Sequence, residues 1–199
     1  MKKKQGCLVL VVGLILVGVL FTTIKYYGSY YWDLYQRPWA YSRDADAPLL
    51  VGKWQGRFTD PDGVAKKLAL EIFVPTTDEE RWEKAGRKSR RRRGSSARRN
   101  FDGVALVESK LGKESYELWG GVNKDDYHLF TLDFITDETK MLPINNFYIN
   151  DSNPNNWHDD SMTLVLNFSF RRPDKSSFWS SSDPRFDKKV TVTLNRQKQ

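Results

Sequence analysis

Apolar and polar residues alternate along most of the chain beyond residue 49, and this period of two constrains the fold more than any other feature. Successive side chains of a β-strand point to opposite faces, so these segments predict strands with one buried face. In the first segment Leu50, Trp54 and Phe58 share a face, and the Pro-Asp-Gly sequence that follows predicts a turn. We expect about eight strands, in residues 49–58, 66–75, 101–109, 115–122, 127–136, 144–150, 161–170 and 188–196.

Turns rich in Gly, Asn, Asp and Pro connect these segments, which is typical of an antiparallel meander. A closed barrel leaves no unpaired edge strand, so we expect the last strand to return beside the first. Within the domain, one segment begins like a short helix, with Thr76 or Thr77 at its start. The predicted fold class is therefore all-β, an antiparallel up-and-down barrel at residues 49–199 that follows one N-terminal transmembrane helix.

The first predicted strand carries Gly52, Trp54 and Gly56 in the sequence VGKWQGRF. This motif, followed by an up-and-down series of strands, is similar to the lipocalin and wider calycin barrels. The resemblance implies that Trp54 closes one end of the barrel. The alternative is that Trp54 is an ordinary core tryptophan. The long basic connection departs from the compact family pattern, so the resemblance does not extend to a specific ligand.

The N-terminus begins with a triple lysine and then carries 18 uncharged, mostly apolar residues from Cys7 to Ile24. A helix of that length is roughly 27 Å long, close to the hydrocarbon thickness of a bilayer. Residues 7–24 are therefore expected to be a signal-anchor that crosses the membrane once, after a basic N-terminus at 1–6. A cleaved signal peptide is the alternative, although no small-residue cleavage motif follows the apolar run.

The triple lysine should keep residues 1–6 in the cytoplasm and place the barrel on the extracytoplasmic side of the inner or plasma membrane. Residues 25–48 would then form a juxtamembrane stalk rich in Tyr and Trp, whose rings favour the headgroup zone. Some of these rings could instead pack on the barrel domain, and the two interpretations are compatible. The expected membrane-interface residues are Tyr26, Tyr27, Tyr30, Tyr31, Trp32 and Tyr35.

Nine Lys or Arg and no acid lie within residues 84–99, here called the basic block. Four more of the 32 basic residues lie in residues 2–25. The remaining 19 basic residues are outnumbered by 25 acidic residues, so the net charge of +7 comes from the basic block and the N-terminus. The block belongs to the connection 76–100 and is expected to bind an anionic partner. A solvated insertion is the alternative. Its basic residues are Lys84, Arg87, Lys88, Arg90, Arg91, Arg92, Arg93, Arg98 and Arg99.

The sequence contains few motifs that are typical of catalytic or metal-binding sites. Neither His128 nor His158 falls in a Ser-His-Asp or metal-ligand spacing. Residues 151–162 begin like a calcium loop but lack its glycine and its final glutamate, so a solvated turn is expected there. Gly120 and Gly121 are expected to mark a bulge or bend in their strand. We predict no cofactor and no bound metal, and a single cysteine excludes an intrachain disulfide.

These expectations favour a binding role over catalysis. The leading hypothesis is an interaction or assembly subunit of a membrane-associated complex, which contacts membrane lipid or an acidic protein partner through the basic block. A lipocalin-like carrier or sensor of a small apolar ligand is the alternative, and an uncharacterised enzyme is the third. Nucleic acid would satisfy the same charges, but the extracytoplasmic topology argues against it. A continuous cavity inside the barrel would favour the carrier.

Overall fold

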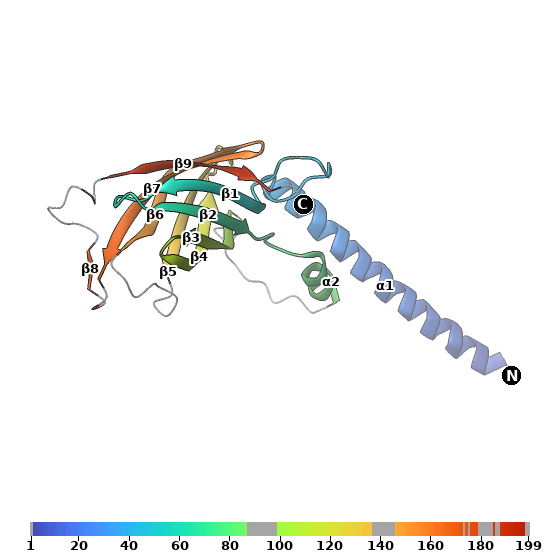
Figure 1. The fold of residues 1–199 in the computed structure, drawn as a ribbon. Coiled ribbons are helices and arrows are strands. Elements are labelled where there is room, and N and C mark those ends of the chain that lie inside the picture. Colours follow the sequence, from blue (N-terminus) through green and yellow to red (C-terminus); the bar gives the residue numbers. More distant parts are fainter. Residues whose placement is uncertain are drawn as a thin grey trace.

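The computed structural model describes residues 2–86, 99–136, 146–172, 174, 176–178, 185 and 188–197. Within them an antiparallel sheet closes into a barrel, and a long helix precedes it (Figure 1). The predicted fold class is confirmed. The helices are α1 (Lys2–Gln36) and α2 (Asp78–Gly86), and the strands are β1 (Gly52–Thr59), β2 (Ala65–Ile72), β3 (Asn100–Ser109), β4 (Gly112–Val122), β5 (Leu129–Thr136), β6 (Asn146–His158), β7 (Ser161–Arg171), β8 (Ser177–Phe178) and β9 (Val190–Arg196).

Pairing between the first and last strands closes the barrel. β1 pairs with β2 on one side and with β9 on the other, where Trp54 faces Arg196 and Gly56 faces Leu194. From β1 to β7 each strand pairs with the next, and β9 completes the ring between β7 and β1. The two-residue β8 pairs with the end of β7. The chain therefore follows the predicted meander, with its last strand beside its first.

Gly56 allows β1 and β9 to approach each other closely at this seam. A Cβ atom on residue 56 would lie 2.5 Å from the Thr193 carbonyl oxygen and 2.5 Å from Leu194 Cδ2. Contacts this short are impossible in a close-packed interior, so any larger residue would push the two strands apart. The glycine two residues after Trp54 is therefore required for closure of the barrel.

Inward-facing apolar side chains form the core of the barrel. The predicted apolar faces are buried, as for Leu68 and Leu70 on β2. Aromatic rings from nearby strands contact one another within the core. These ring pairs are Phe101–Phe130 at 6.1 Å between centroids, Tyr116–Phe134 at 5.8 Å and Phe58–Phe168 at 5.9 Å. Such geometry is that of favourable aromatic packing, so the core is stabilised by large rings contributed by many strands.

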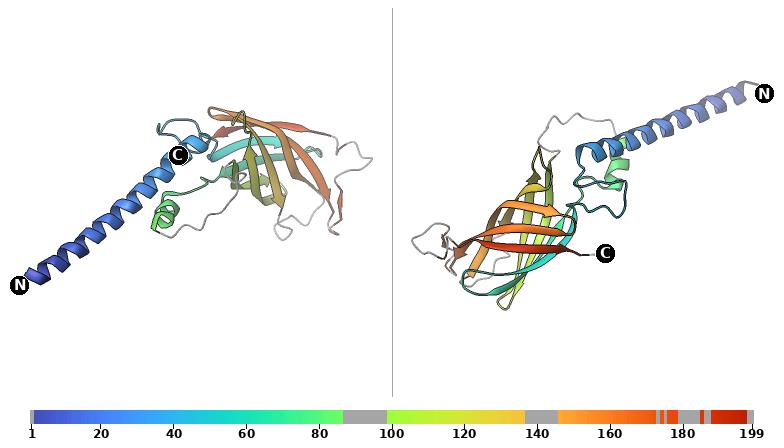
Figure 2. Two further views of the ribbon diagram at one scale, coloured as in Figure 1. Left: turned by 180° about the vertical axis from the view of Figure 1, so that it is seen from behind. Right: turned by 90° about the horizontal axis from the view of Figure 1, so that it is seen from above.

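The two ends of the barrel differ in what lies beside them. α1 leaves the barrel from one end, here called the proximal end, and α2 lies beside α1 there (Figures 1 and 2). Strands β1, β3, β5 and β7 begin at the proximal end. The opposite, distal end carries the turns at residues 60–64 and 110–111 and the short strand β8. Everything that connects the barrel to the N-terminal helix is therefore at the proximal end.

α1 is one continuous helix, so the predicted span at 7–24 runs without a break into the predicted stalk. Its stretch Leu10–Gln36 is long and apolar enough to cross a membrane, a test that a signal sequence near the N-terminus also passes. After Gln36 the chain folds back onto the barrel, where Trp39 and Leu50 are buried in the core. The stalk is therefore helical in its first part and packed on the proximal end in its second.

The solvated turn predicted within residues 151–162 is wrong, because most of this segment belongs to β6. β6 pairs with both β5 and β7, with register shifts between Ile149 and Asn156. The Asn, Asp and Pro content favours turns locally, but two neighbouring strands supply backbone partners that override this preference. The turn is confined to Asp159 and Asp160, and Asp159 has a φ of 51°.

The bulge predicted at Gly120 and Gly121 is also wrong. Both glycines lie in regular antiparallel pairs with β3 and with β5. A Cβ atom on residue 120 would lie 2.3 Å from Phe101 Cζ and 2.5 Å from the Thr131 carbonyl oxygen. Gly120 therefore makes room for the Phe101 ring in the core rather than bending the strand.

Candidate functional site

The aromatic residues that follow the apolar run divide between two faces of α1. Tyr26 stacks on Trp82 of α2 with ring centroids 4.1 Å apart, and Tyr30 lies under the Arg81 guanidinium. The other four predicted interface residues are exposed by half or more, namely Tyr27, Tyr31, Trp32 and Tyr35. The three tyrosines among them are four residues apart, so they form one stripe along the helix. Part of the predicted set thus packs on α2, and an exposed stripe remains.

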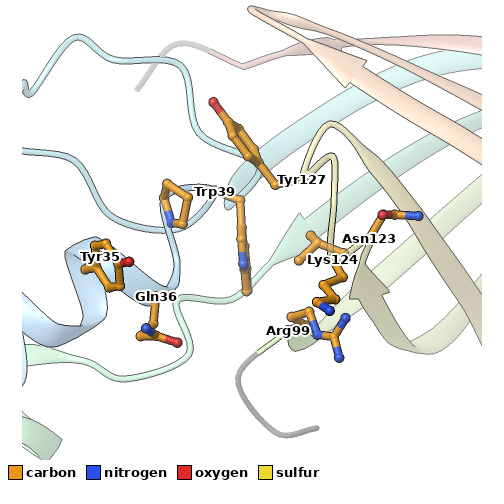
Figure 3. Close-up of a pocket in the computed structure, with 9 residues that line it drawn as sticks. Tyr35, Gln36, Trp39, Arg99, Asn123, Lys124 and Tyr127 are labelled. Atoms are coloured by element: carbon orange, nitrogen blue, oxygen red, sulfur yellow. The ribbon is translucent and has the colours of Figure 1, made fainter. Parts of the chain in front are cut away.

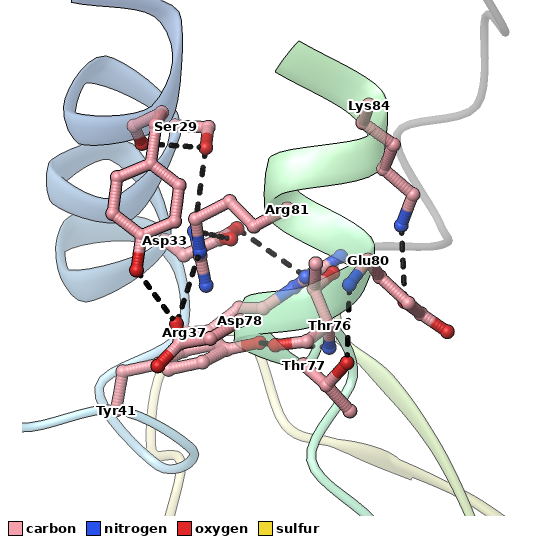
Figure 4. A network of polar contacts seen from close by, with 11 residues as sticks. Ser29, Asp33, Arg37, Tyr41, Thr76, Thr77, Asp78, Glu80, Arg81 and Lys84 are labelled. Atoms are coloured by element: carbon pink, nitrogen blue, oxygen red, sulfur yellow. Dashed lines mark hydrogen bonds and ion pairs between the residues drawn. The ribbon is translucent and has the colours of Figure 1, made fainter. Parts of the chain in front are cut away.

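Arg81 lies at the centre of the contact between α1 and α2 (Figure 4). Its side chain is 1% exposed, and Nη1 donates to Asp33 Oδ2 at 2.8 Å and to Ser29 Oγ at 3.5 Å. Asp33 also pairs with Arg37, one turn further along α1, at 3.3 Å. The Arg81 guanidinium lies 5.4 Å from the centre of the Tyr41 ring. A buried ion pair between distant parts of the sequence therefore joins the two helices.

Tyr41 fixes the residues just before α2. Its hydroxyl accepts a hydrogen bond from the Thr76 N–H at 2.8 Å and donates to the Thr76 carbonyl at 2.9 Å. Burial, helped by the Asp33 carboxylate, raises the pKa of Tyr41, so the hydroxyl remains a donor. Thr77 then caps the helix, because its Oγ1 accepts from the Glu80 N–H at 3.2 Å. The short helix predicted to begin at these threonines is confirmed.

Replacing Arg81 with Ala is expected to separate α2 from α1. The change leaves the Asp33 carboxylate without this partner, and breaking a buried pair typically costs about 3–5 kcal/mol. Because a helix of nine residues is marginal in isolation, hydrogen–deuterium exchange of residues 78–86 should accelerate by at least about tenfold. Glu79→Ala is the matched control, since Glu79 is an exposed residue of the same helix. Wild-type exchange rates in the Arg81→Ala protein would contradict this docking role.

The basic block begins and ends at the proximal end of the barrel. Lys84 lies in the last turn of α2, and Arg99 directly precedes β3. The Arg99 carbonyl accepts a hydrogen bond from the Val122 N–H, at the proximal end of β4, at 2.9 Å. The other predicted anion-binding residues lie outside the described residues, namely Arg87, Lys88, Arg90, Arg91, Arg92, Arg93 and Arg98. The two described members thus place both ends of the block on the side from which α1 leaves.

Trp54 lies at the proximal end together with Arg196 of the last strand. The indole is fully buried, and its Nε1 donates to the Leu50 carbonyl at 2.9 Å. The Arg196 guanidinium lies 4.3 Å from the centre of the indole and donates to the carbonyls of Val51 and Leu49. A cation over an aromatic face is stabilising, and more so when it is partly desolvated. The first strand, the last strand and the chain before β1 are therefore joined around Trp54.

One concave surface at the proximal end holds about 370 Å³ between the end of α1 and the β4–β5 loop (Figure 3). Its lining includes the rings of Tyr35, Trp39 and Tyr127 and the cations Arg99 and Lys124, but no carboxylate. The buried Trp39 Nε1 has no hydrogen-bond partner among the residues that the structure describes. This surface offers donors and positive charge next to the point where the basic block ends.

The two histidines lie near each other at the proximal end. Their ring centroids are 5.5 Å apart, and His128 Nδ1 lies 3.1 Å from the Trp157 carbonyl oxygen. His158 is exposed beside Asp159, with 3.3 Å between Nδ1 and the carboxylate. Within the described part of the chain, no group of three or more His, Cys, Asp or Glu could hold a metal ion. The histidines are thus positioned by aromatic and backbone contacts.

A buried polar cluster near the distal end was not predicted from the sequence. Lys66 Nζ donates to the Phe147 carbonyl at 2.6 Å and to Glu114 Oε1 at 3.4 Å, and lies 3.7 Å from Asp60 Oδ2. The Tyr116 hydroxyl donates to the second oxygen of Glu114 at 2.8 Å. Burial and the neighbouring carboxylate raise the pKa of Tyr116 well above its ordinary value. One lysine therefore holds two carboxylates inside the barrel.

Comparison with known proteins supplies no family for this chain. No protein-family description matches it, and no curated protein sequence matches it. A solved structure described as a de novo design of a fluorescence-activating β-barrel aligns with 74% of this chain and 93% of its own, at 13% identity and a TM-score of 0.36. A TM-score this low gives no information about the function of this chain.

Proposed function

We propose that this protein is a single-pass, membrane-anchored interaction and assembly module whose basic block contacts anionic groups beside the membrane. α1 serves as the anchor, the barrel as the rigid body, and α2 as the link between them. The observation that carries the proposal is that α1, α2 and Arg99 meet at one end of the barrel (Figure 1). Because α1 leaves from that end, both ends of the basic block are on the side of the barrel that faces the anchor.

The charge of the block is sufficient for such a contact. Each Lys or Arg near an anionic bilayer contributes on the order of 1 kcal/mol, and the effect fades over about 10 Å. Nine charges within residues 84–99 would bind even if part of the block stayed in solvent. The rest of the chain has more acidic than basic residues, so repulsion by an anionic surface would favour the orientation with the proximal end toward it.

Packing inside the barrel favours the interaction role over the carrier role. A carrier needs a cavity for its ligand, whereas large buried rings occupy the described core near both ends of the barrel, with Phe101 paired to Phe130 and Phe58 paired to Phe168. Small barrels whose side chains fill the interior serve as scaffolds, with function on the loops. The resemblance to calycins accordingly remains a prediction about how Trp54 closes the barrel, not about a bound ligand.

A fluorescent label inside the basic block would test the proposal. The full-length protein with Cys7→Ser and Ser95→Cys carries one thiol, which takes an environment-sensitive dye. In phosphatidylcholine vesicles that also contain phosphatidylglycerol, emission should shift to shorter wavelength, because the charges draw the block to the anionic surface. Raising salt from about 0.1 to 0.5 M should reverse most of the shift through screening.

The matched variant replaces Arg90, Arg91, Arg92 and Arg93 with Ser in the same labelled background. It should lose most of the lipid-dependent shift while its melting temperature stays close to that of the parent, since surface substitutions contribute little to the core. A salt-sensitive shift in native membranes but not in pure lipid would support an acidic protein as the partner. Equal emission from parent and variant under all conditions would contradict an interaction role for the block.

A further inference from the structure

A crevice of about 350 Å³ lies between α1 and α2. Its lining includes Lys25 and Ser29 from α1, and Arg81 and Lys84 from α2. With the Asp33 carboxylate, which also lines it, the crevice is surrounded by three positive charges, one negative charge and a hydroxyl (Figure 4 shows Ser29, Asp33, Arg81 and Lys84). The crevice is therefore a candidate site for an anionic group.

The hydrogen bonding of Arg81 is incomplete. A guanidinium has five N–H donors, and the contacts with Asp33 and Ser29 both use Nη1. Nε and Nη2 are buried and have no hydrogen-bond partner among the described residues, although Nε lies 3.8 Å from Asp78 Oδ1. Buried donors without partners are unfavourable, and an acceptor bound in the crevice would satisfy them. An oxyanion with several acceptor atoms fits this need best.

The acidic groups near the crevice are already paired. The Asp33 carboxylate, which also lines it, accepts from both Arg81 and Arg37. Glu80 pairs with Lys84 at 3.2 Å on the exposed side of α2. Lys25 has its Nζ over the Phe21 ring at 4.6 Å, a weak contact that leaves its N–H groups available. Around the crevice four cations, Lys25, Arg37, Arg81 and Lys84, face three carboxylates, Asp33, Asp78 and Glu80, so one positive charge is in excess.

The height of the crevice along α1 identifies the source of the anion. Lys25 directly follows the last residue of the apolar run, Ile24. At about 1.5 Å per residue, Lys25 and Ser29 lie roughly 2 and 8 Å beyond the end of that run. The headgroup layer on each side of a bilayer is roughly 5–7 Å thick. The crevice thus opens at the depth of phospholipid phosphates when the apolar run crosses the membrane.

We propose that the crevice between α1 and α2 binds the phosphate of one anionic phospholipid. Arg81 would donate from its unpaired nitrogens, and Lys25 and Lys84 would supply charge from either side. The acyl chains would then extend along the exposed apolar side chains of α1, which include Phe21 and Ile24. The inference rests on the membrane anchor of the proposed function and adds a defined lipid site that does not involve residues 87–98.

Native mass spectrometry of the full-length protein in mild detergent would test the site. The delipidated protein is titrated with phosphatidylglycerol, and the fraction that retains one lipid is measured. Lys25→Gln with Lys84→Gln should weaken retention on the order of tenfold, because two charges near the phosphate are removed. The control pair Lys188→Gln with Lys189→Gln, two exposed lysines before β9, should retain lipid like the wild type.

Equal lipid retention by the Lys25/Lys84 variant and the wild type, with α2 still protected from hydrogen exchange in both, would overturn the inference. Binding of inorganic phosphate with the same affinity as the lipid would also overturn it, because the site would then be one for a free anion. The variant with Arg90–Arg93 replaced by Ser separates the two proposals. If that variant still retains one phosphatidylglycerol in native mass spectrometry, the crevice site is supported, even when the dye at residue 95 shows no emission shift with vesicles.

Discussion

Trp54→Ala should lower the free energy of unfolding by about 3–5 kcal/mol, since that is the usual cost of truncating a fully buried large aromatic residue. The cost here has a second part. The Arg196 guanidinium, which lies over the indole and pairs with Asp160 at 3.0 Å, would lose the ring that covers it. Burial lowers the pKa of Arg196, so this cation already depends on its remaining partners. Chemical denaturation of the full-length protein in detergent measures the change.

Trp119→Ala is the matched control for this experiment, because Trp119 lies on β4 with about half of its surface exposed. Its replacement should change stability by no more than about 0.5 kcal/mol. If Trp54→Ala were as mild as Trp119→Ala, Trp54 would not hold the barrel end together. Strand pairing would still support the barrel fold, but the resemblance to calycins would no longer be supported.

Lys66→Ala should also destabilise the protein by about 3–5 kcal/mol, because it leaves buried carboxylates without their cation. Asp60 and Glu114 are at most 3% exposed, so solvent cannot replace the ammonium group. The Phe147 carbonyl would also lose the hydrogen bond from Lys66. Unfolding midpoints in denaturant, measured on the full-length protein, give the size of the loss.

Lys67→Ala is the control, because residue 67 lies on the other face of the same strand and is partly exposed. A change of no more than about 0.5 kcal/mol is expected there. Replacing Asp60, Lys66 and Glu114 together by Asn, Met and Gln should recover much of the loss, since this cluster then holds no charged group. A Lys66→Ala protein as stable as Lys67→Ala would show that the cluster is hydrated.

The strands were predictable because their pattern is local. Buried and more exposed residues alternate along β2, β3 and β5, so the sequence pattern predicts both the strands and the face that each buries. Lys66 follows the same rule. It lies two and four residues before Leu68 and Leu70 on β2, so it shares their inward face. The alternation along β2 alone would have placed Lys66 on the inner face. A lysine inside a barrel is expected, however, only when its distant partners Asp60 and Glu114 are known.

The connection between the helices could not be predicted in this way. The partners Arg81 and Asp33 are 48 residues apart, and neither belongs to a periodic pattern that would indicate the pairing. The same holds for β6, whose composition favours turns and whose extended form depends on β5 and β7. The two described ends of the basic block, Lys84 and Arg99, lie at the proximal end because α2 packs on α1 and β3 begins there. The charge of the block was readable from the sequence, whereas the location of these two ends required the fold.

The proposed function requires α1 to cross the membrane and to hold the barrel on the extracytoplasmic side. The most direct test labels intact cells that produce the full-length Cys7→Ser, Lys110→Cys protein with a membrane-impermeant maleimide, followed by an alkaline carbonate wash. Residue 110 lies in an exposed turn at the distal end. With this topology, the protein should be labelled in intact cells and should stay in the membrane pellet. Labelling only after the cells are broken, or release of the protein into the supernatant, would contradict it.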